Sequence, residues 1–187
     1  MGTLRTVIGL VITKIIGLGI YFGYVNILYA AVNLAVVYDA TYMWKKLSVN
    51  KLIVITFFVT LIIFNYYLKQ CYHDNPGHII QIIVVSQTSD IYQYVAGKCF
   101  GRNKIGWISP NKTLEGYAIG YFLTIFTLLP IYDGSNITSI YVLGVLGGLI
   151  SSLFKRIVGI KDYSNLLGPH GGWTDRIDSI IGPVLFS

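Results

Sequence analysis

The chain has 187 residues and a formal net charge of +6, and 54% of its residues are hydrophobic whereas only 12% are charged. A soluble domain of this length carries about 25% charged residues, and the mean hydropathy of this chain is high at +0.63. Because the apolar residues form long blocks rather than amphipathic stripes, these values exclude an ordinary soluble domain and indicate an integral membrane protein.

Six apolar blocks predict six membrane-spanning helices. We expect one all-α, polytopic membrane domain over 1–187, with N-terminal spans in 1–78 and catalytic spans with a signature loop in 79–187. The apolar tail Ile177–Ser187 is too short to cross alone, because a spanning helix needs roughly 20 residues. The first block shows no small-residue cleavage site, so we expect a span there and not a signal peptide. The expected spans are about 6–24, 25–43, 52–68, 79–97, 117–132 and 137–154.

Positive charge lies mostly on one side of this topology. With a cytoplasmic N-terminus, twelve of the fourteen Lys and Arg residues fall in inner segments, whereas Lys69 is outside and Lys14 is within the first span. This distribution follows the positive-inside rule and explains the net charge without a nucleic-acid partner. We therefore expect a multi-pass protein whose two long inner loops, 98–116 and 155–176, face the cytoplasm.

The inner loop 98–116 places a cation beside an expected helix start. Ser109-Pro110 breaks the chain, and Asn111 or Thr113 can cap the helix that follows. A helix start beside Lys112 is suited to binding an anion. An ordinary capped turn with lysines facing lipid headgroups explains the same residues.

Asp90 is an acid inside the fourth expected span. It lies about eight residues from the cytoplasmic end, which is on the order of 12 Å of depth at the helical rise. Ionisable groups at such depth usually face a cavity or a partner and mark function. We expect Asp90 on the floor of a polar cleft that opens to the cytoplasm. The structural alternative is a pair with a cation from another span, such as Lys14.

The stretch 152–178 concentrates charged residues, a histidine and paired glycines in an otherwise apolar chain. Asp175 and Asp178 would share one face of a helix, and two neighbouring carboxylates favour a bound cation. Hard oxygen ligands near phosphate indicate Mg²⁺ rather than zinc. Gly171-Gly172 permits the close approach or positive φ of a phosphate-binding turn. A hydrogen-bonded loop histidine at His170 and a salt-bridged helix start at the two acids are the structural alternatives.

This stretch resembles the signature of the phosphatidate cytidylyltransferases, or CDP-diacylglycerol synthases. The family pattern is Ser, two residues, Lys-Arg, four residues, Lys-Asp, and then His-Gly-Gly, two residues, Asp-Arg, an apolar residue and Asp. Upstream, Ser89-Asp90-Ile91, Gly101-Arg102 and the run 109–116 resemble another recurrent stretch, so the likeness covers about 86–187. The matching signature residues are Ser152, Lys155, Arg156, Lys161, Asp162, His170, Gly171, Gly172, Asp175, Arg176, Ile177 and Asp178.

The resemblance implies transfer of CMP from CTP to phosphatidate with Mg²⁺, and it is compatible with a second cation. It implies CTP, phosphatidate and membrane lipid as partners, no nucleic acid, and a protein of the endoplasmic reticulum or a comparable internal membrane, with a homodimer as a compatible assembly. The implied catalytic residues are Asp175, Asp178, Lys161, Asp162 and His170, and the implied metal ligands are Asp175, Asp178 and Asp90. The implied substrate-binding residues are Lys155, Arg156, Arg176, Ser109, Lys112, Glu115, Gly171, Gly172 and Ser152.

Three features depart from the family pattern. Trp173 replaces an aliphatic residue, which we expect to alter packing. The run 147–152 lacks the Gly-Asp-Leu of bacterial members and looks like the eukaryotic branch, so the third metal ligand would be Asp90 or Asp162. The chain is also short for the family.

Other functions stay open at this point. A CTP-dependent enzyme that acts on another lipid phosphate or on a polyprenol would differ in its acceptor. A transporter that uses Asp90 and Asp175 as ion ligands would show flux without CTP. A truncated, inactive relative would bind nucleotide without turnover.

Overall fold

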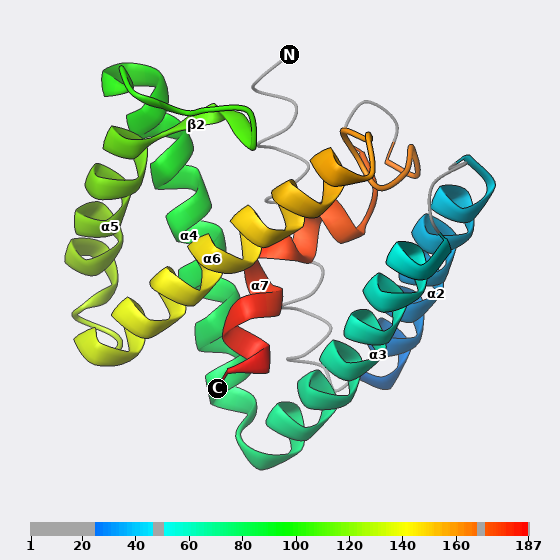
Figure 1. Ribbon diagram of the computed structural model, residues 1–187. Helices are drawn as coiled ribbons and strands as arrows, with labels where there is room; N and C mark the ends of the chain where they lie inside the picture. The colour runs from blue at the N-terminus through cyan, green and yellow to red at the C-terminus, as the bar shows by residue number, and fades with distance from the viewer. Residues whose placement is uncertain (1–24, 47–50, 168–170, 187) are drawn as a thin grey trace. The chain divides into compact units, whose positions relative to one another are not determined.

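The computed structural model describes residues 25–46, 51–167 and 171–186 (Figure 1). These residues form six helices and one two-stranded hairpin. In chain order the elements are α2 (Val25–Lys46), α3 (Lys51–Asp74), α4 (Pro76–Phe100), β1 (Lys104–Ile105), β2 (Ser109–Thr113), α5 (Leu114–Leu128), α6 (Gly134–Ile157) and α7 (Thr174–Leu185).

The expected spans from the second onward correspond to helices α2 to α6, which confirms the helical reading of these apolar blocks. The first expected span, 6–24, and Lys14 lie outside the described residues. Within the described ranges, α6 is the one helix that passes a test for crossing a membrane by length and apolar composition. The short tail is the 12-residue helix α7, whose first turn contains Asp175.

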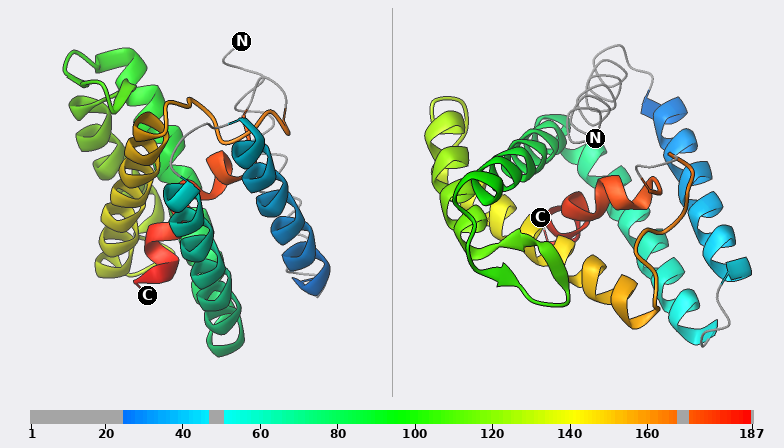
Figure 2. Two further views of the ribbon diagram at one scale, coloured as in Figure 1. Left: turned by 45° about the vertical axis from the view of Figure 1, so that its right-hand side comes forward. Right: turned by 90° about the horizontal axis from the view of Figure 1, so that it is seen from above.

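The described residues are mostly helical, as expected, and the exception is the inner loop before α5, where β1 and β2 pair antiparallel. Gly106 turns the hairpin with φ of +54°, and Pro110 prevents a helix from continuing through β2. Leu114 N–H donates to the Asn103 carbonyl at 2.9 Å and so closes the hairpin against the start of α5. The views in Figure 2 place this hairpin at the ends of α4 and α5.

The helix starts around the hairpin have the capping residues that the sequence indicates. Asn75 caps α4 by accepting the His78 N–H at 3.2 Å, and Pro76 occupies the first turn. Thr113 caps α5 by accepting the Gly116 N–H at 3.1 Å, which confirms one of the two predicted caps. Gly116 also allows close packing of α5 on α4, because a Cβ there would lie 2.8 Å from the Gln93 carbonyl oxygen.

The chain divides into two compact units. The first joins Met1–Tyr67 with Ile157–Ile177, and the second joins Leu68–Arg156 with Asp178–Ser187. In the first unit, Met43, Leu61, Phe64 and Tyr163 are almost fully buried. The described core of the second unit comprises Ile79, Ile82, Val85, Ala96, Leu128, Ile137, Ile140, Tyr141, Ile180 and Val184.

Candidate functional site

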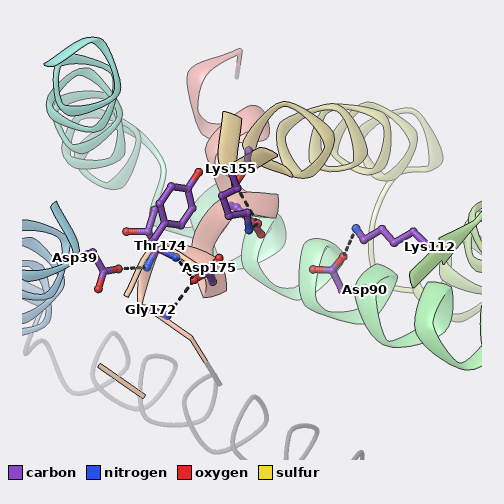
Figure 3. Close-up of polar contacts among 10 residues, drawn as sticks. Asp39, Asp90, Lys112, Lys155, Gly172, Thr174 and Asp175 are labelled. Atoms are coloured by element: carbon purple, nitrogen blue, oxygen red, sulfur yellow. Dashed lines mark hydrogen bonds and ion pairs between the residues drawn. The ribbon is translucent and has the colours of Figure 1, made fainter. Parts of the chain in front are cut away.

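A buried ion pair joins α6 to α7 in the second unit (Figure 3). Nζ of Lys155 lies 3.6 Å from Oδ2 of Asp178, and the two side chains are only 10% and 19% exposed. Ser151, one helical turn earlier on α6, donates its hydroxyl to the same Asp178 oxygen at 3.2 Å. The structure thus brings together two residues of the predicted set and adds Ser151, which the sequence analysis did not select.

A second, more exposed ion pair of the same unit joins α4 to the hairpin (Figure 3). Nζ of Lys112 lies 3.9 Å from Oδ1 of Asp90, with side-chain exposures of 35% and 39%. Lys112 also lies 5.4 Å from the centroid of the Tyr117 ring. Asp90 therefore has a described cationic partner on β2, whereas the alternative partner Lys14 lies outside the described residues.

The charge of Lys112 interacts with the carboxylates of both Asp90 and Asp178. Burial by itself lowers the pKa of Lys112, but Asp90, followed by Tyr117 and Asp178, outweighs that effect and raises the pKa above its ordinary value of 10.5. A raised pKa keeps the ammonium group charged throughout the physiological range. The second unit therefore combines two lysines and two aspartates that come from α4, β2, α6 and α7, and we call these four residues the lysine–aspartate cluster.

Glu115 fixes the hairpin that carries Lys112. Its carboxylate accepts the backbone N–H groups of Arg102 and Asn103, each at 3.1 Å, and the Asn103 side-chain amide at 2.7 Å. Its own backbone N–H, and then those of Asn103 and Arg102, lower the pKa of Glu115 below its ordinary value of 4.5. Glu115 was predicted to bind substrate, and the described contacts show a carboxylate engaged with the hairpin backbone.

The first unit holds the other part of the signature stretch. Oδ2 of Asp175 accepts the Tyr163 N–H and the Gly172 N–H, each at 2.9 Å (Figure 3). Gly171 has φ of +81°, which a residue with a side chain rarely adopts. A Cβ at Gly171 would also lie 2.9 Å from Oδ2 of Asp175. The loop is therefore folded back on the first turn of α7, and Asp175 holds it there.

Asp39 on α2 is a residue that the sequence analysis missed. Its side chain is buried, with the residue 1% exposed, and it bonds with the signature loop on both carboxylate oxygens. The signal was available, because an acid inside an expected span is the same feature that selected Asp90. It was overlooked because the family likeness began only at residue 86.

The remaining predicted residues are spread over α6, the hairpin and the loop. Lys161 and Asp162 are exposed in the loop, and Ser109 is buried in β2. Ser152 and Arg156 on α6 and Arg176 on α7 are half-buried. His170 lies outside the described residues.

The acids of these clusters have the donor type that Mg²⁺ takes, since carboxylate oxygens are hard ligands. Across residues 25–46, 51–167 and 171–186, no group of three or more His, Cys, Asp or Glu side chains is arranged to hold a metal ion. Mg²⁺ commonly binds through one or two carboxylates and completes its shell with water and substrate phosphate. In donor chemistry alone, these carboxylates are compatible with Mg²⁺.

The sequence matches a known protein family along almost its whole length. The profile of a family described as Cytidylyltransferase family matches residues 3–187. The phosphatidate cytidylyltransferase of Aquifex aeolicus is 33% identical over 169 residues, which cover 86% of this chain and 64% of that protein. The phosphatidate cytidylyltransferase of Bacillus subtilis is 36% identical over 138 residues, which cover 62% of this chain and 51% of that protein.

A third relative has no assigned activity in its name. The protein named Uncharacterized protein YnbB of Escherichia coli is 36% identical over 121 residues, which cover 58% of this chain and 41% of that protein. The chain thus spans between about two fifths and two thirds of the length of these three relatives.

Proposed function

Since the chain belongs to the cytidylyltransferase family, we propose that it transfers CMP from CTP to phosphatidate and so produces CDP-diacylglycerol and pyrophosphate. The observation that carries the proposal is the lysine–aspartate cluster, in which Lys155 and Asp178 of the signature pair at 3.6 Å. The relatives named phosphatidate cytidylyltransferase support phosphatidate as the acceptor.

The proposed reaction joins two polyanions and needs no side-chain nucleophile. A phosphate oxygen of phosphatidate attacks the α-phosphorus of CTP, a new phosphorus–oxygen bond forms, and the bond to the β-phosphate oxygen breaks. The attacking oxygen is already anionic, so no general base has to remove a proton. The main requirements are to offset repulsion, to align the two phosphates and to stabilise the leaving pyrophosphate.

The cations of this chain would supply most of that stabilisation. Lys112 stays protonated at physiological pH, and the two pairs of the cluster hold Lys112 and Lys155 on separate elements of one unit. We propose that these lysines bind phosphate oxygens together with Arg156, Lys161 and Arg176. The remaining proposed substrate contacts are those of Ser109, Ser152, Gly171 and Gly172, with Glu115 acting on the hairpin that presents Lys112.

Asp175, Asp178 and Asp90 are the proposed Mg²⁺ ligands. Asp175 and Asp178 are three residues apart on α7, a spacing that puts both on one face of that helix. When bound, Mg²⁺ supplies charge that neutralises phosphate oxygens during the transfer. Asp162 is the alternative to Asp90 as the third ligand, and His170 is proposed to donate to a phosphate oxygen or to orient an acid.

A membrane location fits the side chains on the helix surfaces. Phe126, Ile62 and Leu34 are 82%, 67% and 72% exposed, and soluble proteins rarely display so many large apolar side chains. We propose a multi-pass protein with a cytoplasmic N-terminus, in which α2, α3, α4 and α6, of 22 to 25 residues, are long enough to cross a bilayer. The site would then open to the cytoplasm, where CTP is available.

The test is formation of a CDP-lipid by the detergent-purified chain from CTP labelled at its α-phosphate, phosphatidate and Mg²⁺. We expect labelled CDP-diacylglycerol, and we expect Asp178→Asn to abolish it while the protein still inserts and folds. Labelled product with a different lipid phosphate or a polyprenol, but none with phosphatidate, would show that phosphatidate is not the acceptor. Nucleotide binding without any turnover would identify an inactive relative.

A further inference from the structure

Asp39 is a buried acid in an apolar helix, and its carboxylate accepts hydrogen bonds from two residues of the signature loop. Ser164 donates its hydroxyl to Oδ1 of Asp39 at 2.6 Å across 125 residues of sequence. Thr174 donates its backbone N–H to Oδ2 at 2.7 Å across 135 residues. All three residues belong to the first unit, and each is at most 1% exposed.

These contacts offset the cost of burying a carboxylate. A buried carboxylate without partners is strongly destabilising, whereas hydrogen bonds to a charged acceptor are short and strong. Thr174 is the first residue of α7, so its N–H is one of the donors that a helix start leaves without a partner inside the helix. Asp39 therefore caps α7 from another helix, and Figure 3 shows its carboxylate directed at Thr174.

The same carboxylate explains the second glycine of the signature pair. A Cβ at Gly172 would lie 2.7 Å from Oδ2 of Asp39, closer than real Cβ contacts allow. Gly171 is the glycine that needs positive φ, whereas Gly172 does not have it. The two glycines thus have different roles, and the role of Gly172 is to admit Asp39.

Asp39 is connected to the proposed catalytic acid Asp175 through a single residue, Gly172. Gly172 lies against Asp39, and its N–H donates to Oδ2 of Asp175 at 2.9 Å. Asp39 holds Thr174, the residue immediately before Asp175, and it also holds Ser164, whose neighbour Tyr163 donates to Asp175. The backbone on both sides of the Asp175 carboxylate is therefore fixed by one acid on α2.

We propose that Asp39 is a positioning residue that sets the signature loop and the carboxylate of Asp175 for nucleotidyl transfer. The statement that Asp39 positions Asp175 for catalysis rests on the proposed function. The structural part, that Asp39 orders the loop, stands independently of any activity.

The experiment compares Asp39→Asn with Asn65→Ala in the full-length, detergent-purified chain. Asn matches Asp in size but presents an amide group to one of the two donors. Asn65 is a matched control, because it is a buried polar residue of the same unit, is 6% exposed, and bonds through its side chain to Leu61 of its own helix α3. Amide hydrogen exchange over residues 160–177, kcat and the KM values for CTP and phosphatidate are measured below the unfolding transition of each variant.

We expect Asp39→Asn to speed exchange in that segment by about tenfold or more, as loss of hydrogen bonds to a charged acceptor implies. We also expect kcat to fall by about tenfold or more with little change in either KM, because the shift of a catalytic group acts mainly on the transition state. Asn65→Ala should leave exchange over 160–177 and kcat close to the wild-type values.

Unchanged exchange in Asp39→Asn would overturn the inference. A kcat loss no larger than that of Asn65→Ala would overturn the catalytic part. If Asp39→Asn does not fold, Ser164→Ala provides the second test. It removes the bond to Asp39, together with the bond that the Ser164 hydroxyl accepts from the Leu166 N–H, and keeps the Thr174 contact. Unchanged exchange at the amides of the segment other than Leu166 would count against the inference. If the wild-type chain has no turnover, the proposed function fails, and the ordering role is decided by exchange alone.

Discussion

Lys155 and Ser151 hold the carboxylate of Asp178 from one side of α6. The ammonium nitrogen lies 3.6 Å from Oδ2, and the serine hydroxyl donates to that same oxygen at 3.2 Å. The two donors are four residues apart and therefore lie on one face of the helix. This arrangement fixes the orientation of Asp178 on α7 and keeps a cation beside it.

Replacing Lys155 with methionine should destabilise the protein by about 1–3 kcal/mol, because a largely buried carboxylate loses its cation. Lys155→Arg keeps the charge and should cost less. Thermal unfolding in detergent measures both, and an unfolding temperature for Lys155→Met equal to that of the wild type would contradict the role of the pair.

Lys112→Met should separate stability from activity. Its pair with Asp90 is more than one third exposed, so its loss should cost at most about 1 kcal/mol. Turnover should fall by about 10²-fold if the ammonium group stabilises transferring phosphate. Unfolding temperature and CDP-lipid formation are compared with those of Lys112→Arg, and equal losses of stability and activity would indicate a structural lysine.

Gly182→Ala should be poorly tolerated, because its Cβ would clash with the Leu143 carbonyl oxygen where α7 crosses α6. Separating the helices would cost about 1–3 kcal/mol or more. Gly148→Ala is the matched control on α6, since its Cβ would have the Lys112 ammonium nitrogen as its nearest neighbour, at 3.7 Å. That substitution should be neutral or slightly stabilising, as expected of alanine in a helix, and unfolding temperatures test the difference.

The hairpin should weaken in acid through Glu115. The folded protein lowers the pKa of this carboxyl, so its contribution is complete above pH 4.5 and is lost as the pH falls through the lowered pKa. Glu115→Gln removes this titration. The difference in unfolding temperature between wild type and variant should therefore shrink as the pH falls from 6 to about 3. A constant difference would show that ionised Glu115 does not stabilise the hairpin.

Gly172→Ala and Asp39→Ser should be coupled in a double-mutant cycle. Alanine at 172 places a methyl group against the Asp39 carboxylate, and the shorter serine makes room for it. The double variant should therefore be more stable than the sum of the single losses predicts. Additive losses of stability would mean that the two positions do not interact.

Sequence alone determined where the helices α2 to α6 lie, and it narrowed the cap of α5 to Asn111 or Thr113. Those features follow from apolar blocks and from capping chemistry within a few residues, so a single sequence contains them. The predicted signature acids also fall on one helix, α7, because their spacing is a local property. The sequence also selected Asp90, Lys112, Lys155 and Asp178 as candidate site residues, but it did not predict which of them form ion pairs.

Only the tertiary structure decided which groups meet. It paired Asp90 with Lys112 and Asp178 with Lys155, replaced a loop by the β1–β2 hairpin, and brought Asp39 to the start of α7. A buried charge must find a partner, but its sequence neighbourhood does not say which one, since packing of distant elements selects among several. The physical reason is that composition and spacing encode local conformation, whereas contacts between different helices and loops are fixed by how those elements pack.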